Sequence, residues 1–316
     1  MFDRMIFNIK ISSENEAAEI AARNKLEKWE SENATQYQSN EIAKMTGVYI
    51  IIKTGKMQVK CSLHKYYNSL LNGKLENDGM FTLSDAWRAF ETLFESIGID
   101  KERVRVTYFE IGLNIPTDRE PIQYIEKARN ISMGKAAKTE KVMFIDANYH
   151  INRQKTTEKR KTIKKVFKIY DKGFEKTDRR RTAPTDEKIL RIETTYRRQS
   201  MKVSNFFKPT NIERIAQTFF RDWESLEFVR TVTADKGIRE SQLRNAENII
   251  LLGRETYLNH IRDELDKGNL TVRQHRTIRE FVRDWDDNKH KYRMLPTECE
   301  KEFKAKFKKL FKAAKQ

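Results

Sequence analysis

A single tyrosine stands among lysines in the stretch KKVFKIYDKGFEK, residues 164–176. The period-two alternation of a strand places Lys168, Tyr170 and Lys172 on one face and the apolar residues between them on the other. Such a pattern is typical of a solvated strand, of a surface that grips nucleic acid, or of a catalytic tyrosine. The residues suit the third interpretation, because the lysine ammonium groups can neutralise phosphate oxygens while the tyrosine hydroxyl attacks phosphorus.

A second strand-like segment, residues 104–115, carries an acid and an amide on its polar face. Glu110, Gly112 and Asn114 alternate with apolar residues there. Glycine inside a strand often marks a place where another group comes close to the backbone. The spacing therefore predicts a polar face on which another group comes close to Gly112.

A third segment, residues 189–197, places Arg191 and Glu193 on its polar face. Glu110 and Glu193 can supply the hard oxygen ligands that a divalent cation prefers. Lys168 and Arg191 can neutralise the charge of a bound phosphate. Together the three strands contain the parts for metal-assisted attack of a tyrosine on a phosphodiester.

A rival tyrosine lies in KVMFIDANYHI, residues 141–151. The same alternation puts Tyr149 on the apolar face and His150 on the polar face. The strand period thus favours Tyr170 as the nucleophile, with Tyr149 kept as the alternative. His150 can supply one nitrogen to a metal, although a lone histidine in a strand is more often structural.

The net charge of +17 is concentrated in two places. Residues 153–181 hold 13 Lys and Arg against four acids, and residues 301–316 hold seven Lys against one Glu. Concentrated charge of this kind favours contact with nucleic acid over mere solubility. We expect the phosphate-binding side chains of the first run to include Lys159, Arg160, Lys161 and Lys164.

The composition bounds the class of protein. Charged residues make up 34% of 316 residues and the hydrophobic share of 38% includes 18 Phe, which predicts a folded chain with a heavily charged surface. Cys61 and Cys299 are far apart, which excludes a disulfide framework and a Cys-pair zinc site. The first residues are too charged for a signal peptide, and no apolar run approaches membrane length. We expect a cytoplasmic protein that does not contact a membrane.

The order of strand and helix signals predicts an α+β fold with a central antiparallel sheet and flanking helices, followed by C-terminal helices. We expect an α+β domain over residues 1–204 and a helical, DNA-binding or accessory domain over residues 205–316. The segment TLSDAWRAFETLFESIG predicts a helix that Thr82 or Ser84 caps and Gly98 ends. The spacing of aromatic residues in the C-terminal tail, residues 301–316, predicts an amphipathic helix whose aromatic face packs on the other helices.

Seven short motifs, in this order, resemble those of the replication initiators of filamentous phages and rolling-circle plasmids. They cover most of the chain and are MFDRMIFNIKI, SLHKYYN, YFEIGLNI, KIYDKGFE, LRIETTYRR, VSNFFKP and FFRDWESLEF. Each motif is short and degenerate, so the resemblance depends on their order and spacing. The Tyr66-Tyr67 pair in the second motif is expected to be a packing element of a strand.

The resemblance implies a relative of the HUH-type nickases, which cut one DNA strand at an origin. These enzymes keep the 5′ phosphate on a tyrosine and leave a 3′ hydroxyl for a polymerase. By motif position Tyr170 is the nucleophile, Lys172 contacts phosphate, and Glu110 with Glu193 binds Mg²⁺ or Mn²⁺. The implied partners are single-stranded or supercoiled origin DNA, with a host helicase and polymerase.

The chain departs from that group in its histidines. The two-histidine metal motif, His-apolar-His, is absent, and the five histidines stand singly at positions 64, 150, 260, 275 and 290. Two alternatives therefore stay open: a nucleic-acid-binding protein without catalysis, and a relaxase of a mobile element. The sequence also leaves open the oligomeric state, for which a dimer is one option, and whether a plasmid, phage or transposon encodes the chain.

Overall fold

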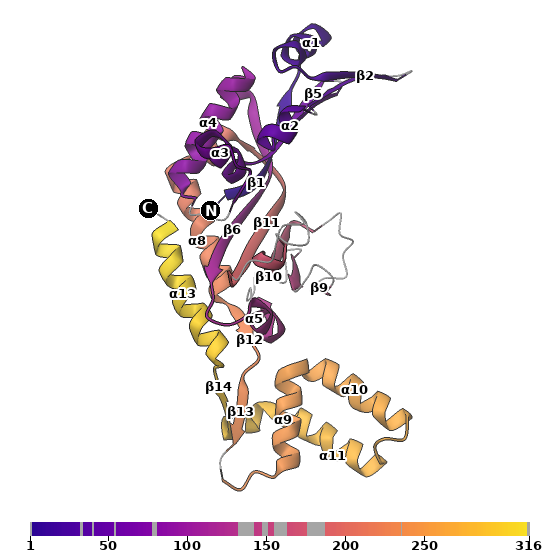
Figure 1. The fold of residues 1–316 in the computed structure, drawn as a ribbon. Coiled ribbons are helices and arrows are strands. Elements are labelled where there is room, and N and C mark those ends of the chain that lie inside the picture. Colours follow the sequence, from indigo (N-terminus) through magenta and orange to yellow (C-terminus); the bar gives the residue numbers. More distant parts are fainter. Residues whose placement is uncertain are drawn as a thin grey trace. The chain divides into compact units, whose positions relative to one another are not determined.

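The computed structural model describes most of the chain, namely residues 2–31, 34–39, 41–53, 55–77, 81–131, 142–146, 151–154, 163–175, 187–234 and 236–314. The chain forms two compact units, which we describe separately (Figure 1). The first unit contains residues 1–126, 130–226 and 303–316, and the second contains residues 127–129 and 227–302. The change at residue 226 differs from the division expected at residue 204, because helix α8 belongs to the first unit.

A mixed but largely antiparallel sheet forms the centre of the first unit, as predicted for an α+β fold. Among the described residues it has ten strands. Only β10 and β8 pair in parallel among the strand pairs that the structure describes. In spatial order the strands are β2 (Glu27–Ser31), β3 (Ala34–Gln38), β4 (Tyr49–Lys53), β5 (Lys56–Ser62), β1 (Phe2–Lys10), β6 (Val104–Pro116), β11 (Ile189–Lys202), β10 (Lys165–Asp171), β8 (Val142–Asp146) and β9 (Ile151–Gln154).

The long strands β6 and β11 lie side by side at the middle of this sheet (Figure 1). Their apolar faces alternate with polar ones as the sequence predicts, and residues such as Ile111, Leu113 and Ile192 are buried. In the hairpin between β4 and β5, Gly55 adopts φ of 67° and Lys53 pairs with Lys56. Glycine reaches that left-handed conformation without steric cost.

The helices of the first unit begin and end where capping residues stand. Thr82 caps α4 by a reciprocal pair of hydrogen bonds with Asp85, and Gly98 ends the helix in the left-handed conformation, as predicted. Among the described residues no helix is long and apolar enough to cross a membrane. The helices are α1 (Glu14–Arg23), α2 (Glu41–Thr46), α3 (Leu63–Asn72), α4 (Leu83–Ile97), α5 (Pro121–Lys127), α7 (Val203–Phe206), α8 (Pro209–Glu224) and α13 (Glu298–Ala314).

Helix α8 is fixed to the sheet by two buried polar contacts. The indole nitrogen of Trp223 donates to Thr194 Oγ1 over 2.9 Å, and Lys165 Nζ lies 2.9 Å from Asp222 Oδ2. Helix α13 then packs on α8, where the ring of Phe307 stacks on Phe220 with centroids 5.2 Å apart. Trp223 is buried there, and the burial of Phe303, Phe307 and Phe311 confirms that the aromatic face of the C-terminal helix packs on other helices.

One segment differs from its prediction, and three elements were not predicted. Tyr66 and Tyr67 lie in helix α3, not in a strand. Ser62 ends β5, and its hydroxyl accepts a hydrogen bond from the Lys65 backbone, which starts the helix. Helix α1 and strands β2 and β3 were not predicted. Strands β2 and β3 are short and polar, and their sequences show little apolar alternation.

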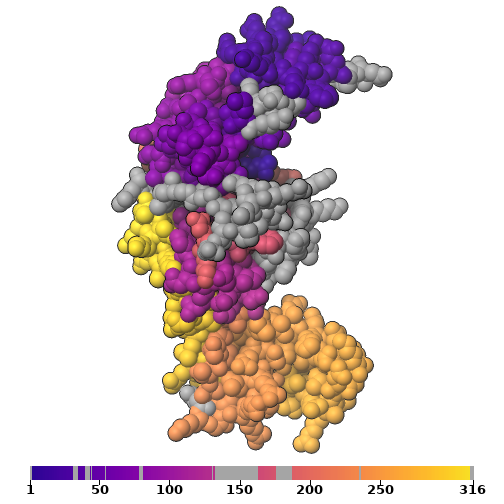
Figure 2. Space-filling view, viewed as in Figure 1, coloured from indigo at the N-terminus to yellow at the C-terminus, as the bar shows by residue number. Residues whose placement is uncertain are grey.

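The second unit is mainly helical and has its own core. Its residues Glu227–Glu302 form one contiguous body, drawn in orange (Figure 2). Trp285 and Tyr292 pack together in this core with Val232, Ile249 and Val282. Its elements are α9 (Glu240–Leu252), α10 (Arg254–Asp266), α11 (Val272–Arg283), α12 (Trp285–Asn288), η3 (Lys289–Lys291), β13 (Thr231–Ala234) and β14 (Tyr292–Leu295), while β7 (Ala128–Ile131) and β12 (Leu226–Phe228) lie where the chain passes between units.

Candidate active site

The register of three neighbouring strands brings the predicted polar faces together. Strand β11 lies between β6 and β10 and pairs antiparallel with both. The pairing creates two adjacent cross-strand rows, Tyr170–Arg191–Asn114 and Lys168–Glu193–Gly112. Side chains in neighbouring rows on one face of a sheet are within reach of each other.

A cavity of about 770 Å³ lies over these rows within the first unit. Five of the predicted site residues line it: Glu110, Lys168, Tyr170, Lys172 and Glu193. The size is that of a typical small-molecule or nucleotide site. The structure therefore gathers, in one hollow, residues that the sequence separates by up to 83 positions.

Tyr170 is held in place by an acid. Its hydroxyl donates a hydrogen bond to Glu193 Oε1 over 2.8 Å, and the residue is 4% exposed. Lys172, Arg191 and Glu193 are also buried, so this polar face is not a solvated strand surface, which was one of the three interpretations of the pattern. The polar side chains pair with one another, and these hydrogen bonds and ion pairs offset the free-energy cost of their burial.

Lys168 bridges the two acids. Its ammonium nitrogen lies 2.8 Å from Glu110 Oε1 and 3.2 Å from Glu193 Oε2. Burial alone would lower the pKa of Lys168, but the charges of Glu193 and Glu110 raise it above its ordinary value. The ammonium therefore stays charged between the carboxylates at neutral pH.

The pKa of Glu193 is lowered by its neighbours. Burial opposes ionisation, but the charges of Lys168 and Arg191 outweigh it and hold the pKa of Glu193 below its ordinary value. Glu193 is thus a carboxylate that accepts hydrogen bonds from Tyr170 and from Arg191 Nε, the latter over 3.1 Å. An ionised acceptor of this kind can take the proton of a hydroxyl that reacts.

Glu110 is held by three donors on one oxygen. Tyr108 donates a short hydrogen bond to Glu110 Oε1, Lys168 donates over 2.8 Å, and Thr195 Oγ1 donates over 3.1 Å. Burial and the nearby Glu110 charge raise the pKa of Tyr108 above its ordinary value, so that hydroxyl stays protonated. Tyr108 and Thr195 were not predicted as site residues, although both lie on the predicted polar faces.

Arg191 crosses the sheet and joins the site to β1. Its guanidinium donates to Asp3 Oδ2 over 3.0 Å and to Asn114 Oδ1 over 2.9 Å. It passes so close to Gly112 that a Cβ atom there would lie 2.4 Å from Arg191 Nη2. This contact confirms that the glycine marks a close approach, and it gives Asn114 the role of positioning Arg191.

Gly112→Ala is expected to destabilise the first unit by about 1–3 kcal/mol, because the added methyl group overlaps an anchored guanidinium. In an ordinary strand the same change would be stabilising by roughly 0.5–1 kcal/mol. Urea unfolding measures the difference. In an Arg191→Met background the cost should vanish, and a cost that persists there would show that another neighbour is responsible.

Asp3 was missed by the sequence analysis, although it faces the centre of the site. It accepts hydrogen bonds from Arg191, from Asn77 Nδ2 over 2.8 Å and from Ser62. Burial would raise its pKa, but the charge of Arg191 and the bond from Ser62 lower the pKa of Asp3 to about 2. The pairing of β1 with β6 shifts its register between Phe2 and Met5, so simple alternation along the strand does not predict the face on which Asp3 lies.

The Asp3 pKa predicts an acid-sensitive contribution to stability. The folded-state pKa lies below the ordinary value of 3.8, so the contribution is complete above that value and is lost as the pH falls toward 2. Its full size is about 2 kcal/mol. Urea unfolding at several pH values should show the stability gap between the native chain and Asp3→Asn narrowing on acidification. A gap that does not change with pH would contradict the assignment.

Basic residues line the cavity alongside Glu110 and Glu193. Lys172 is buried, lies 2.6 Å from Glu175 Oε2, and lines the same cavity. Arg4, Lys60 and Lys65 also line it, and Arg4 is exposed. The first unit therefore offers several cations to an anion that enters the cavity.

One further predicted DNA-binding residue that the structure describes does not line this cavity. Lys164 is exposed and lines a separate cavity of about 380 Å³ with Phe109 and Tyr196, on the apolar side of the strands. The remaining ones lie outside the described residues and stay predictions; these are Tyr149, His150, Lys159, Arg160 and Lys161.

The donors around Glu110 and Glu193 do not fit a bound divalent cation in this arrangement. Mg²⁺ and Mn²⁺ are held by several oxygen ligands, whereas the position facing both carboxylates is taken by the Lys168 ammonium. Among the residues that the structure describes, no group of three or more His, Cys, Asp or Glu is arranged to hold a metal. The Mg²⁺ or Mn²⁺ cofactor stays a prediction, and no chemical step below depends on it.

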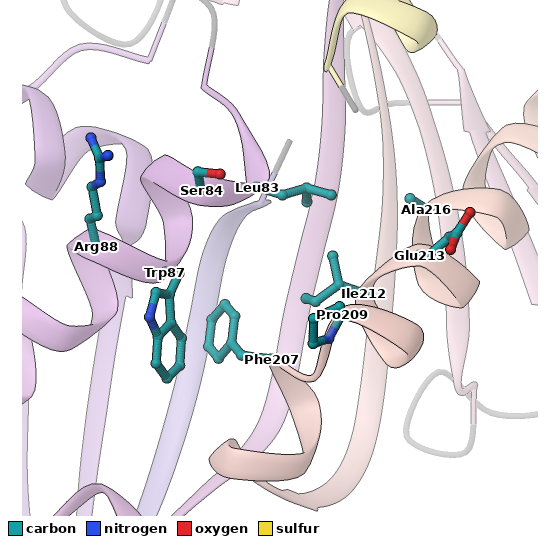
Figure 3. Close-up of a pocket in the computed structure, with 9 residues that line it drawn as sticks. All are labelled: Leu83, Ser84, Trp87, Arg88, Phe207, Pro209, Ile212, Glu213 and Ala216. Carbon is teal, nitrogen blue, oxygen red and sulfur yellow. The ribbon is translucent and has the colours of Figure 1, made fainter. Parts of the chain in front are cut away.

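Another cavity of the first unit, of about 570 Å³, has a different character (Figure 3). Trp87 and Phe207 lie together in it with ring centroids 5.0 Å apart, next to Pro209 and Ile212. Arg88 points away from the two rings (Figure 3). Ser84 and Glu213 lie apart in its lining (Figure 3), so no nucleophile is seen beside a base, and the cavity over β10 and β11 remains the candidate active site.

Comparison with known proteins found similarity to a solved structure. That structure is a rolling circle replication initiator protein from Geobacillus stearothermophilus, with a TM-score of 0.34 and 9% sequence identity. The matched region covers 79% of this chain and 95% of that chain. No protein-family model matches the sequence, and no curated protein matches it.

Proposed function

We propose that this chain nicks one strand of DNA by attack of Tyr170 on a backbone phosphate and thereby initiates rolling-circle replication. The observation that carries the proposal is the 2.8 Å hydrogen bond from the Tyr170 hydroxyl to Glu193, inside a cavity lined by lysines. A nucleophile within hydrogen-bond reach of a base that a further group orients is the arrangement expected for covalent catalysis. Here Arg191 orients the Glu193 carboxylate.

The proposed reaction is a phosphoryl transfer. The bond from Tyr170 Oη to phosphorus forms while the bond from phosphorus to the 3′ oxygen of DNA breaks. The tyrosine proton passes to Glu193, and the leaving 3′ oxygen takes a proton from solvent to become a hydroxyl. The 5′ phosphate then stays on Tyr170, and Glu193 releases its proton to solvent, which balances the proton that the 3′ oxygen takes.

Glu193 acts as the base only when the reaction develops charge. The lowered pKa of Glu193 makes it a weak base in the resting protein. The tyrosine proton becomes more acidic as its oxygen bonds to phosphorus, so the transfer coincides with the attack. Lys172 is placed to stabilise the charge on the phosphate, because it lines the cavity with Tyr170.

Binding of the DNA backbone is assigned to basic residues at the cavity. Arg4, Lys60 and Lys65 at the cavity can hold the phosphates that flank the cut. Contacts of this type position a strand without reading its sequence, and they weaken with salt. The proposed partners are single-stranded or supercoiled origin DNA, and a helicase and a polymerase of the host that use the 3′ hydroxyl.

Labels at either end of a DNA strand, used in separate samples, test the mechanism. Single-stranded DNA of mixed sequence is labelled at its 5′ end in one sample and at its 3′ end in another, and each is incubated with the protein in EDTA, Mg²⁺ or Mn²⁺. The proposal predicts that the 3′ label moves with the protein on a denaturing gel. The 5′ label should appear only in shortened free DNA.

Each other outcome identifies a different function. Shortened DNA with neither label on the protein means that water is the nucleophile and the tyrosine mechanism is wrong. Salt-sensitive binding without any cleavage, on supercoiled plasmid as well as on single strands, favours the non-catalytic nucleic-acid-binding protein. Mass spectrometry of the linked peptide distinguishes Tyr170 from Tyr149.

A further inference from the structure

The position between Glu110 and Glu193 is filled by a side chain of the protein itself. Lys168 Nζ lies 2.8 Å from one carboxylate and 3.2 Å from the other, while its side chain remains 17% exposed at the cavity. An ammonium group has three N–H donors and no acceptor. Two donors are directed at the acids, which leaves a third for a group that enters the cavity.

The surrounding donors fix that ammonium. Tyr108 and Thr195 hold Glu110, while Tyr170 and Arg191 hold Glu193, so each carboxylate is oriented by hydroxyl or guanidinium groups besides Lys168. A divalent cation would have to displace the lysine and then find further oxygen ligands. The described residues offer no arranged third acid for that purpose.

We propose that Lys168 is the resident cation of this site and takes the place that a divalent metal would occupy between Glu110 and Glu193. The inference rests on the proposed function for its catalytic meaning only. The ammonium would donate its third N–H to a non-bridging oxygen of the scissile phosphate and reduce its negative charge. Strand cleavage would then persist in EDTA.

Removal of the ammonium should create a metal site. In Lys168→Met the two acids would face each other without a cation between them, and closely spaced carboxylates attract divalent ions. Isothermal titration with MnCl₂ should show no binding at these acids in the native chain. Lys168→Met should bind Mn²⁺ there, with an affinity at least about tenfold above the upper limit measured for the native chain. Adding Glu110→Gln to Lys168→Met should abolish the gained affinity.

The matched control is Lys164→Met, which removes the same charge from an exposed position outside the cavity. Its Mn²⁺ titration should equal that of the native chain. Circular dichroism confirms that each variant is folded, and the native titration remains decisive should Lys168→Met fail to fold. Native Mn²⁺ binding that Glu110→Gln abolishes would overturn the proposal, and so would a folded Lys168→Met that gains no affinity.

The cleavage assay separates this inference from the proposed function. Adduct formation by the native protein in EDTA supports the resident lysine. Adduct formation that stops in EDTA and returns with Mn²⁺ overturns it while leaving Tyr170 as the nucleophile. Absence of any adduct refutes the nickase, and the titrations still decide whether Lys168 occupies a metal position.

Discussion

Tyr170→Phe is expected to form no covalent protein–DNA species, with strand cleavage slower by about 10⁴-fold or more. The substitution removes only the hydroxyl that donates to Glu193, and it keeps the buried ring. The loss of one buried hydrogen bond costs about 1–3 kcal/mol, since Glu193 keeps Lys168 and Arg191 as partners. The fold and the binding of DNA should therefore survive, which gel-shift titration can verify.

Tyr108→Phe is the matched control for this change. It removes another tyrosine hydroxyl that donates to a buried glutamate, in this case Glu110. It should lower stability to a similar extent and still form the adduct. An adduct in Tyr170→Phe, or a DNA-linked peptide that contains Tyr149, would show that the nucleophile is another residue.

Asp222→Ala is expected to lower the free energy of unfolding of the first unit by about 3–5 kcal/mol. Lys165 and Asp222 form an ion pair 2.9 Å long with side-chain exposures of 8% and 4%. The Lys165 ammonium also lies over the rings of Phe167 and Tyr196 at 5.6 Å and 5.4 Å. Removal of the carboxylate leaves a buried positive charge without its acid, in surroundings that solvate it poorly.

Urea unfolding measures this effect against two controls. Glu120→Ala breaks the Lys188–Glu120 pair of the first unit, whose side chains are 41% and 56% exposed, and should cost roughly 0–0.5 kcal/mol. The double change Lys165→Met with Asp222→Leu should recover most of the loss, because it buries neither charge. If Asp222→Ala costs no more than Glu120→Ala, the contact between α8 and β10 does not stabilise the first unit.

Local sequence patterns determined much of the sheet and the choice of site residues. Alternation in β6, β10 and β11 predicted which side chains share a face, and this is how Tyr170, Glu110 and Glu193 were selected. Gly112 predicted a close approach, because glycine alone leaves room above a strand. Thr82 and Gly98 predicted the ends of α4, since capping depends on residues a few positions apart.

Tertiary structure decided what those faces contact. Alternation predicts that a face is polar, but only the packing of other segments decides whether it is solvated or buried. Asp3 meets Arg191 across 188 positions, and Lys168 meets Glu110 across 58, so no local pattern reveals either contact. The placement of a lysine between two predicted metal ligands follows from the register of β10, β11 and β6, which the whole sheet fixes.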